Sequence, residues 1–173
     1  MGEFEIRRFG PAHDRSLFDC GVDSLNDWLR KQVSQFEKRD LARTYVAVRV
    51  GELQVLGYYA LSMHHVSHEL LPADQAKGLP RLDVPVVLLG RLAVDRTVQG
   101  RGLGAMMLLD VLARATHLSD QVGVRAVEVD ATDQSARRFY LKYGFAPLLD
   151  DGRHLFLPMH VIRKLNLPAP GAG

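Results

Sequence analysis

The stretch Val94–Gly104, which reads VDRTVQGRGLG, decides the fold of this chain. It joins an aliphatic run, Val84 to Val94, to a segment of helical periodicity that begins near Leu103. Its glycines occupy alternate positions at the junction, and glycine lets a ligand approach the main chain closely. Because a helix N-terminus offers unpaired N–H groups and the positive end of its dipole, the strand, the turn and the helix together predict an anion site. That site is best suited to phosphate or pyrophosphate.

Two familiar phosphate loops do not match these residues. The nucleoside-triphosphate loop needs Gly-Lys-Ser/Thr, and here Gly102 is followed by Leu103. The dinucleotide fingerprint needs Gly-x-Gly-x-x-Gly after a first strand, and this turn has another spacing and lies in mid-chain. The pattern that matches is Gln/Arg-x-x-Gly-x-Gly/Ala, read over Gln99–Gly104. A flexible turn that only caps a helix is the alternative.

A second motif lies downstream at Ala136–Phe145, which reads ARRFYLKYGF. In this order the two motifs resemble those of the Gcn5-related N-acetyltransferases, which bind acetyl-coenzyme A, and the resemblance extends roughly from Arg43 to Pro158. It implies an α/β (α+β) fold in a single domain. The central sheet would be mixed, mostly antiparallel, splayed at its middle and flanked by helices.

Hydrophobic periodicity predicts the elements of this domain. An acidic capping box, Ser24-x-x-Asp27, should open an amphipathic helix with Leu25, Trp28 and Val33 on one face. A helix should also start at Leu103, and another should cover Gln134–Tyr143. A long loop with a single helical turn is expected at Val66–Val84, and the turn Gly51-Glu52 should join two strands. The expected strands are Phe4–Phe9, Arg43–Val50, Gln54–His65, Val86–Val94, Val124–Val129 and Leu155–Met159.

Composition limits the class of protein. A chain of 173 residues, 47% apolar and 24% charged, is expected to form one globular domain, here residues 1–165, with a disordered tail over 166–173. No apolar run is as long as a membrane span, and Met1–Glu5 lacks the features of a signal peptide. The single cysteine, Cys20, excludes an internal disulfide and fits a cytoplasmic location. Cys20 precedes a helix, but a semi-buried packing role is favoured over a nucleophilic one.

The resemblance implies which residues hold acetyl-coenzyme A. Backbone groups of Leu92, Ala93 and Val94 would bind the pantetheine arm like an added strand. The amides of Gln99, Gly100, Arg101, Gly102, Leu103 and Gly104 would hold the pyrophosphate. Asp133, Ser135 and Phe139 would line the other side of the coenzyme. Family members often carry Asn where this chain has Asp133, so Ser135 is a candidate replacement for that hydrogen bond.

Tyr140 is the candidate proton donor for the leaving thiolate. A phenol with a pKa of about 10 is protonated at neutral pH and can donate to sulfur. The alternative is a packing aromatic. No general base stands out among Glu52, Asp95, Glu128 and Asp130. Since an α-amine with a pKa of about 8 is partly neutral at physiological pH, an acceptor of that kind is favoured over a lysine side chain.

The three histidines at positions 64, 65 and 68 raise the question of a metal. Zinc sites need three or four convergent ligands, and on a strand His65 would point away from His64 and His68. We therefore expect no metal, and a pocket role for one of these histidines is favoured.

A narrower resemblance concerns residues 18–29, FDCGVDSLNDWL, and the segments 43–46, 57–61 and 85–95. These are similar to the acetyltransferase toxins of bacterial toxin–antitoxin modules, which acetylate the α-amine of aminoacyl-tRNA and block translation. The resemblance implies a homodimer, a ribbon-helix-helix antitoxin as partner, and a basic surface for the tRNA acceptor stem. The candidate tRNA-binding residues are Arg30, Lys31, Lys38, Arg39, Arg43, Arg91 and Arg96.

Two observations leave other functions open. The net charge is only +2, so the basic residues also fit an ordinary solvated surface. An acetyltransferase for a small amine or a protein N-terminus would need a closed acceptor pocket in place of an open basic face. A coenzyme-binding regulatory module without turnover is a third possibility, and Tyr140 argues against it.

Overall fold

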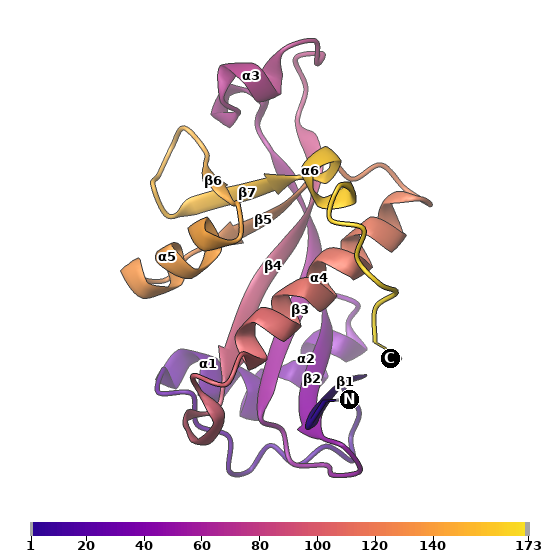
Figure 1. The fold of residues 1–173 in the computed structure, drawn as a ribbon, viewed down its shortest axis with the longest axis vertical. Coiled ribbons are helices and arrows are strands. Elements are labelled where there is room, and N and C mark those ends of the chain that lie inside the picture. The colour runs from indigo at the N-terminus through magenta and orange to yellow at the C-terminus, as the bar shows by residue number, and fades with distance from the viewer. Residues whose placement is uncertain (1, 172–173) are drawn as a thin grey trace. The chain divides into compact units, whose positions relative to one another are not determined.

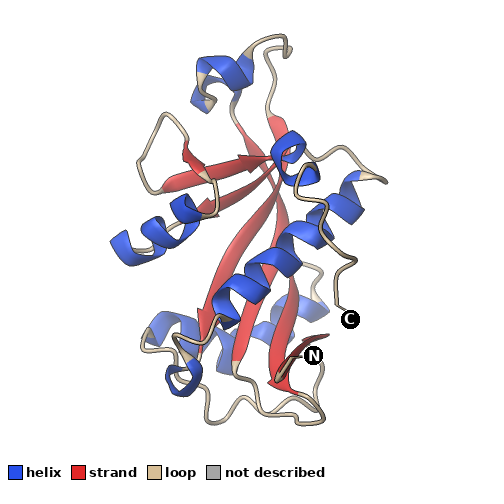
Figure 2. Ribbon diagram, viewed as in Figure 1, coloured by secondary structure: helices blue, strands red, loops and turns tan. Residues whose placement is uncertain are grey.

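The computed structural model describes residues 2–171 and consists of helices and strands in a mixed α/β arrangement (Figures 1 and 2). Its strands belong to one seven-stranded sheet with the order β1-β2-β3-β4-β5-β7-β6. The strands are β1 (Phe4–Arg8), β2 (Arg43–Arg49), β3 (Gly57–Val66), β4 (Val84–Val94), β5 (Ala126–Asp130), β6 (Ala146–Pro147) and β7 (His154–Pro158). The longer helices are α1 (Asp23–Asp27), α2 (Val33–Lys38), α4 (Leu103–Ser119), α5 (Gln134–Lys142) and α6 (Met159–Arg163). The expected fold class is confirmed.

Strand β4 is the apolar run that precedes the glycine turn. It pairs in parallel with β5 over Val86–Leu89, opposite Ala126–Val129, and then continues to Val94. The pairs β1–β2, β2–β3, β5–β7 and β6–β7 are antiparallel. The sheet is therefore mixed, and the parallel pairing stops partway along β4, as expected of a splayed sheet.

The described residues fall into two compact units. The first comprises residues 1–62, 90–111 and 169–173, and the second residues 63–89 and 112–168, with the first and last two residues of the chain outside the described part. Strands β3 and β4 and helix α4 each continue from one unit into the other. Each unit has its own packed interior.

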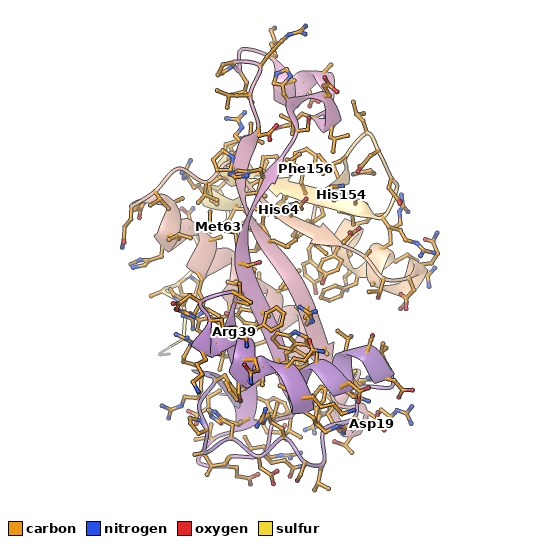
Figure 3. The ribbon with its side chains drawn as sticks, turned by 180° about the vertical axis from the view of Figure 1, so that it is seen from behind. Asp19, Arg39, Met63, His64, His154 and Phe156 are labelled. Carbon is orange, nitrogen blue, oxygen red and sulfur yellow. The ribbon has the colours of Figure 1, made fainter. Side chains whose placement is uncertain are left out.

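In the first unit, helices cover both faces of the strands. Figures 1 and 3, drawn from opposite sides, show the segment from α1 to α2 on one face and the first half of α4 on the other. Beneath α1 and α2, the rings of Trp28 and Tyr58 stack with centroids 5.8 Å apart. The buried members of this core are Phe18, Trp28, Leu29, Val33, Ala42, Val46, Val48, Val55, Tyr58, Ala60 and Ala93.

The predicted start of the first helix is wrong. Helix α1 begins at Asp23 and not after Ser24, and its N-cap, Val22, makes no side-chain hydrogen bond to the helix. The preceding turn is held by Asp19 and the buried Asn26 instead: Asp19 Oδ1 accepts from Gly21 N (2.9 Å) and Asn26 Oδ1 accepts from Cys20 N (2.9 Å). Beyond α1 the segment is not a regular α-helix, because Trp28–Gln32 forms a π-helical turn, η1.

The second unit packs a small core against β5 and β7. Its buried members are Val66, Leu71, Val84, Val86, Ala126, Leu148 and Phe156. The expected loop over residues 66–84 contains two short helices, η2 (His68–Leu70) and α3 (Ala73–Ala76), and Leu70, Ala76 and Leu79 pack on this core. The sequence patterns did not predict β6 or α6.

The end of the chain makes a specific contact within the first unit. The N–H of Gly171 donates to Asp110 Oδ1 at 2.8 Å, and Gly171 lies against Ile6 of β1. Residues 172–173 of the expected disordered tail lie outside the described residues. Among the described residues, no helix is both long enough and apolar enough to cross a membrane.

Gly57 offers a test of packing in the first unit. A Cβ at this position would lie 2.9 Å from Met107 Cε and 3.3 Å from the carbonyl oxygen of Ala93. We expect Gly57→Ala to lower the free energy of unfolding by about 1–3 kcal/mol, the usual cost of overpacking, measured by denaturant titration. Gly123→Ala is the control, because a Cβ there meets nothing within 4 Å. Equal stability of the two variants would contradict this packing.

Candidate functional site

The glycine turn presents unpaired backbone N–H groups. After the short helix η3 (Arg96–Val98), Gly100 and Gly102 adopt φ values of 78° and 82°, and α4 begins at Leu103. Within residues 2–171, the N–H groups of Gly100, Arg101 and Gly102 have no hydrogen-bond acceptor. Residues of alternating handedness turn successive N–H groups toward one point and create an anion-binding concavity. The turn can therefore accept a phosphate oxygen without losing any internal bond.

Two side chains fix the start of this turn. Gln99 Nε2 donates to the carbonyl oxygens of Val94 (2.9 Å) and Cys20 (3.2 Å). The side chain of Gln99, a predicted coenzyme residue, is therefore hydrogen-bonded within the protein itself. Asp95, 3% exposed, accepts through Oδ1 from Thr97 N (2.9 Å) and Oγ1 (2.7 Å) and through Oδ2 from Asp19 N (2.9 Å). Burial alone would raise the pKa of Asp95, but these hydrogen bonds hold it below its usual value. Asp95 is therefore a structural carboxylate and is not available as a general base.

The side chain of Arg101 is also engaged. Its guanidinium pairs with Glu3 and lies over the ring of Phe4 (5.7 Å to the centroid). Arg101 can therefore contribute its backbone N–H to a ligand while its charge stays with Glu3. The backbone of Leu92, Ala93 and Val94 forms the end of β4, immediately before Asp95.

Tyr140 lies on helix α5 in the second unit. Its side chain is buried, and its ring meets those of Phe139 (5.2 Å) and Phe145 (5.4 Å) edge-on. Burial raises the pKa of Tyr140 above its usual value, so the phenol stays protonated at neutral pH. Its hydroxyl makes no hydrogen bond to any residue that the structure describes and is free to donate to a ligand.

Two predicted coenzyme residues, Asp133 and Ser135, lie at the start of α5 and have different roles. Asp133 is the N-cap, and its Oδ1 accepts from Ala136 N at 2.8 Å, which stabilises the helix start. Ser135 is exposed, and no contact occupies its hydroxyl within the described part of the chain. Ser135 is thus the better placed of the two to bind a ligand.

A cluster of charged side chains in the second unit was not predicted from sequence. We call it the Glu128 cluster; its members are His64, Glu128, Asp150 and His154. Glu128 Oε1 lies 2.6 Å from His64 Nδ1, and Glu128 Oε2 pairs with His154 Nε2. His154 Nδ1 in turn lies 2.9 Å from Asp150 Oδ2. Burial lowers the pKa of His154, but the hydrogen bonds to Glu128 and Asp150 outweigh this effect and raise it.

One sequence signal pointed to this cluster. Glu128 is 1% exposed in the middle of strand β5, whereas the other carboxylate of this strand, Asp130 at its end, is exposed. A buried charged residue of this kind needs a partner. The partners come from β3 and from the start of β7, at sequence distances that no local pattern links. Figure 3 shows the side chains of His64 and His154 on the same side of the strands that carry them.

The histidines do not form a metal site together. His68 lies on η2, beyond the end of β3, and so does not share a strand face with His64. No group of three or more His, Cys, Asp or Glu side chains suited to a metal ion occurs within residues 2–171.

Cys20 fits the packing role expected from the sequence. The side chain is half-buried and packs on the core of the first unit. Burial raises the pKa of its thiol, whereas a nucleophilic cysteine needs a lowered pKa.

The predicted tRNA-binding residues all belong to the first unit, and they differ in what occupies them. Arg30 donates to the carbonyl oxygen of Phe18 (2.7 Å), and Arg43 pairs with Asp40 and Glu37. Lys31 pairs with Asp27 (3.5 Å) and Arg96 with Asp19 (3.8 Å), both on the surface. The side chains of Lys38 and Arg39 are exposed and have no charged partner within the described residues.

Arg91 stands apart from these cations. Its guanidinium lies 4.3 Å above the centroid of Trp28 and 5.7 Å from that of Phe36. Burial lowers its pKa, and no carboxylate of the described chain pairs with it. Aromatic stacking therefore fixes this charge while its N–H donors are left for an oxygen-rich ligand.

Comparison with known proteins identifies the family of these motifs. The model of the acetyltransferase (GNAT) family matches residues 9–145. A "tRNA-acetylating toxin" of Mycobacterium tuberculosis (strain ATCC 25618 / H37Rv) is 40% identical over 159 residues, which cover 92% of this chain and 94% of that protein.

Solved structures agree with this relationship. AtaT complexed with acetyl-methionyl-tRNAfMet superposes with a TM-score of 0.89 and 32% identity, covering 94% of this chain and 99% of the other. A mutant AtaT toxin bound to the C-terminus of the antitoxin AtaR and acetyl-CoA superposes with a TM-score of 0.83 and 30% identity. That match covers 96% of this chain and 100% of the other.

Asp95→Asn should destabilise the entry to the glycine turn. An amide has only one acceptor oxygen. Either the donors of Thr97 or the N–H of Asp19 therefore loses its hydrogen bond, at a cost of about 1–3 kcal/mol. Because the folded-state pKa is lowered, this stabilisation is present above the unfolded pKa of about 3.9 and is lost as the pH falls below it. The measurement is the free energy of unfolding of both proteins at pH 7 and near pH 3.

Asp83→Asn serves as the control, because Asp83 is exposed and should change stability by less than about 0.5 kcal/mol. A stability difference between wild type and Asp95→Asn that stays constant down to pH 3 would contradict the structural role of this carboxylate.

Proposed function

Because this chain belongs to the GNAT acetyltransferase family, we propose that it transfers acetyl from acetyl-coenzyme A to the α-amine of aminoacyl-tRNA and thereby inhibits translation as a toxin. The observation that carries the proposal is the 40% identity, over nearly the whole chain, to a tRNA-acetylating toxin. A homodimer and a ribbon-helix-helix antitoxin as partner belong to the same proposal. The antitoxin is supported by the structure of the similar AtaT toxin with the antitoxin AtaR.

The glycine turn is the proposed pyrophosphate site. Its free N–H groups, the two positive φ values and the N-terminus of the long helix α4 offer donors and a positive dipole end to the same anion. Gln99 and Leu103 bound the turn, and the backbone N–H of Gly104 follows in the first turn of α4. We assign the pantetheine arm to the backbone of Leu92, Ala93 and Val94. Ser135 and Phe139 are assigned to the coenzyme as well, with Asp133 acting through the helix start that it caps.

Tyr140 is the proposed proton donor. In the transfer, the amine nitrogen forms a bond to the carbonyl carbon of the thioester, the carbon–sulfur bond breaks, and its electron pair stays on sulfur. The nitrogen, positively charged after its attack, loses one proton to solvent as the amide forms. The Tyr140 hydroxyl gives its proton to the thiolate, and its oxygen regains one from solvent. The raised pKa keeps the phenol protonated until that step, and no internal hydrogen bond competes for its proton.

The basic residues of the first unit are the proposed contacts to the tRNA acceptor stem. Lys38 and Arg39 are exposed without a charged partner, and Arg91 has free donors in a fixed orientation, so these three should contribute most. The proposed contacts also include four residues whose side chains already form a hydrogen bond or ion pair within the chain: Arg30, Lys31, Arg43 and Arg96.

The acceptor can be tested directly. Labelled acetyl-coenzyme A incubated with total aminoacylated tRNA should transfer label to the charged pool and none to deacylated tRNA. Tyr140→Phe should reduce the rate by about 10²–10⁴-fold while it keeps coenzyme affinity, because it removes one general acid. Tyr143→Phe, at the C-cap of the same helix, is the control and should retain the wild-type rate. Label on deacylated tRNA, or on peptide N-termini only, would overturn the proposed acceptor.

The coenzyme assignment is tested at Gly102. A β-branched residue at a φ of 82° is strained by roughly 1–2 kcal/mol, so Gly102→Val should displace the turn and weaken acetyl-coenzyme A binding about tenfold, measured by calorimetry. Gly78→Val imposes similar strain at a φ of 79° on a surface loop and should leave the affinity unchanged. Unchanged affinity in Gly102→Val would place the pyrophosphate elsewhere.

A further inference from the structure

The proposed reaction needs a group that removes a proton from the α-ammonium of the acceptor. An α-amine with a pKa of about 8 is mostly protonated near pH 7, and an ammonium nitrogen has no lone pair with which to attack a thioester. Asp95 is excluded as the base, since both of its oxygens accept internal N–H groups. We infer that His64, oriented by the buried carboxylate of Glu128, removes this proton. The inference rests on the proposed transfer to an α-amine.

The hydrogen-bond pattern of the Glu128 cluster sets the tautomer of His64. His154 lies between two carboxylates, Glu128 on Nε2 and Asp150 on Nδ1, so both of its nitrogens donate and the ring carries a positive charge. Glu128 accepts the N–H of that cation through Oε2. A carboxylate oxygen only accepts, so His64 donates from Nδ1 across the 2.6 Å contact. Its Nε2 is left with a free lone pair.

His64 and Glu128 differ in exposure, and this difference decides which of them can accept the proton. The side chain of Glu128 is 2% exposed and cannot touch a substrate, whereas that of His64 is 54% exposed. Residues 63–65 of β3 are all exposed, so a large acceptor can reach this surface. His64 is therefore the candidate catalytic residue, and Glu128, His154 and Asp150 are positioning residues.

The Glu128 cluster lies in the same compact unit as Tyr140, the proposed proton donor. Glu128 stands opposite Leu88 on β4, one residue before the parallel pairing ends. The backbone proposed to hold the thioester begins at Leu92, four positions further along the same strand.

The proposed step is balanced. One N–H proton of the α-ammonium passes to Nε2 of His64, and the freed lone pair forms the bond to the carbonyl carbon. The carbon–sulfur bond breaks toward sulfur, which takes the proton of Tyr140, and the nitrogen loses a second proton to solvent as the amide forms. His64 then releases its proton to solvent from its exposed edge, and the Tyr140 oxygen regains one from solvent.

The pH dependence of His64→Gln tests this role. Without the base, the reaction needs amine that is already neutral, about one tenth of the total at pH 7 and nearly all of it at pH 9.5. We expect kcat/KM of His64→Gln to be at least about tenfold below wild type at pH 7 and within about threefold at pH 9.5. His65→Gln is the matched control, because this exposed neighbour lies outside the cluster, and it should follow wild type throughout.

Glu128→Gln provides a second variant. Its amide keeps the volume but loses the charge that orients His64, so the same pH-dependent deficit should appear in weaker form. If His64 and Glu128 contributed only to stability, their variants would lower kcat/KM by the same factor at every pH. A pH-independent ratio in His64→Gln, or a rate equal to wild type at pH 7, overturns the inference.

Two acceptors separate this inference from the proposed function. The profiles are measured with aminoacyl-tRNA and with a short peptide that carries a free α-amine. Turnover of the peptide alone would disprove the tRNA acceptor, while the ratio measured with the peptide still decides the role of His64. Turnover of charged tRNA with a pH-independent ratio would disprove the role of His64 and leave the acceptor standing.

Discussion

Strand β4 loses its parallel partner after Leu89 and continues to Val94, just before the segment that carries the glycine turn. Strand β4 keeps β3 as its neighbour on one edge, and on the other edge its backbone N–H and C=O groups beyond Leu89 are left to bind another partner such as a ligand. The end of β4 is held within the first unit, where Asp95 N donates to the carbonyl oxygen of Leu56 (2.8 Å) and Gln99 binds the carbonyl oxygen of Val94. The glycine turn therefore leaves the strand from a fixed point.

Two buried carboxylates, Asp95 and Glu128, illustrate how surroundings decide the role of the same chemical group. Asp95 is surrounded by N–H and O–H donors that belong to the loop itself, so it can only hold that loop in place. Glu128 is surrounded by two imidazoles, one half-buried between carboxylates and one open to solvent. An imidazole can pass a proton on, whereas an amide N–H cannot, so only Glu128 is connected to the exterior by a titratable group.

Local patterns predicted most elements within a few residues. The glycine turn, the start of α4 at Leu103 and helix α5 were all expected, because each depends on residues close together in the chain. The capping of the first helix was predicted wrongly. Ser24 and Asp27 have the spacing of a capping box. In the structure, however, the side chains of Asp19 and Asn26 accept the backbone N–H groups of the turn before the helix. The two-residue strand β6 and the five-residue helix α6 were missed, since segments that short have no measurable periodicity.

The sequence alone determined the family, the fold class and the segments that carry coenzyme chemistry, because the motifs around Gly102 and Tyr140 work through local backbone geometry. Tertiary structure decided how each charge is used. It assigned Arg101 to Glu3, stacked Arg91 on Trp28, and brought His64, Glu128 and His154 together from three strands. The physical reason is range: backbone conformation follows neighbouring residues, whereas the partner of a charged side chain is set by the register of strands far apart in the chain.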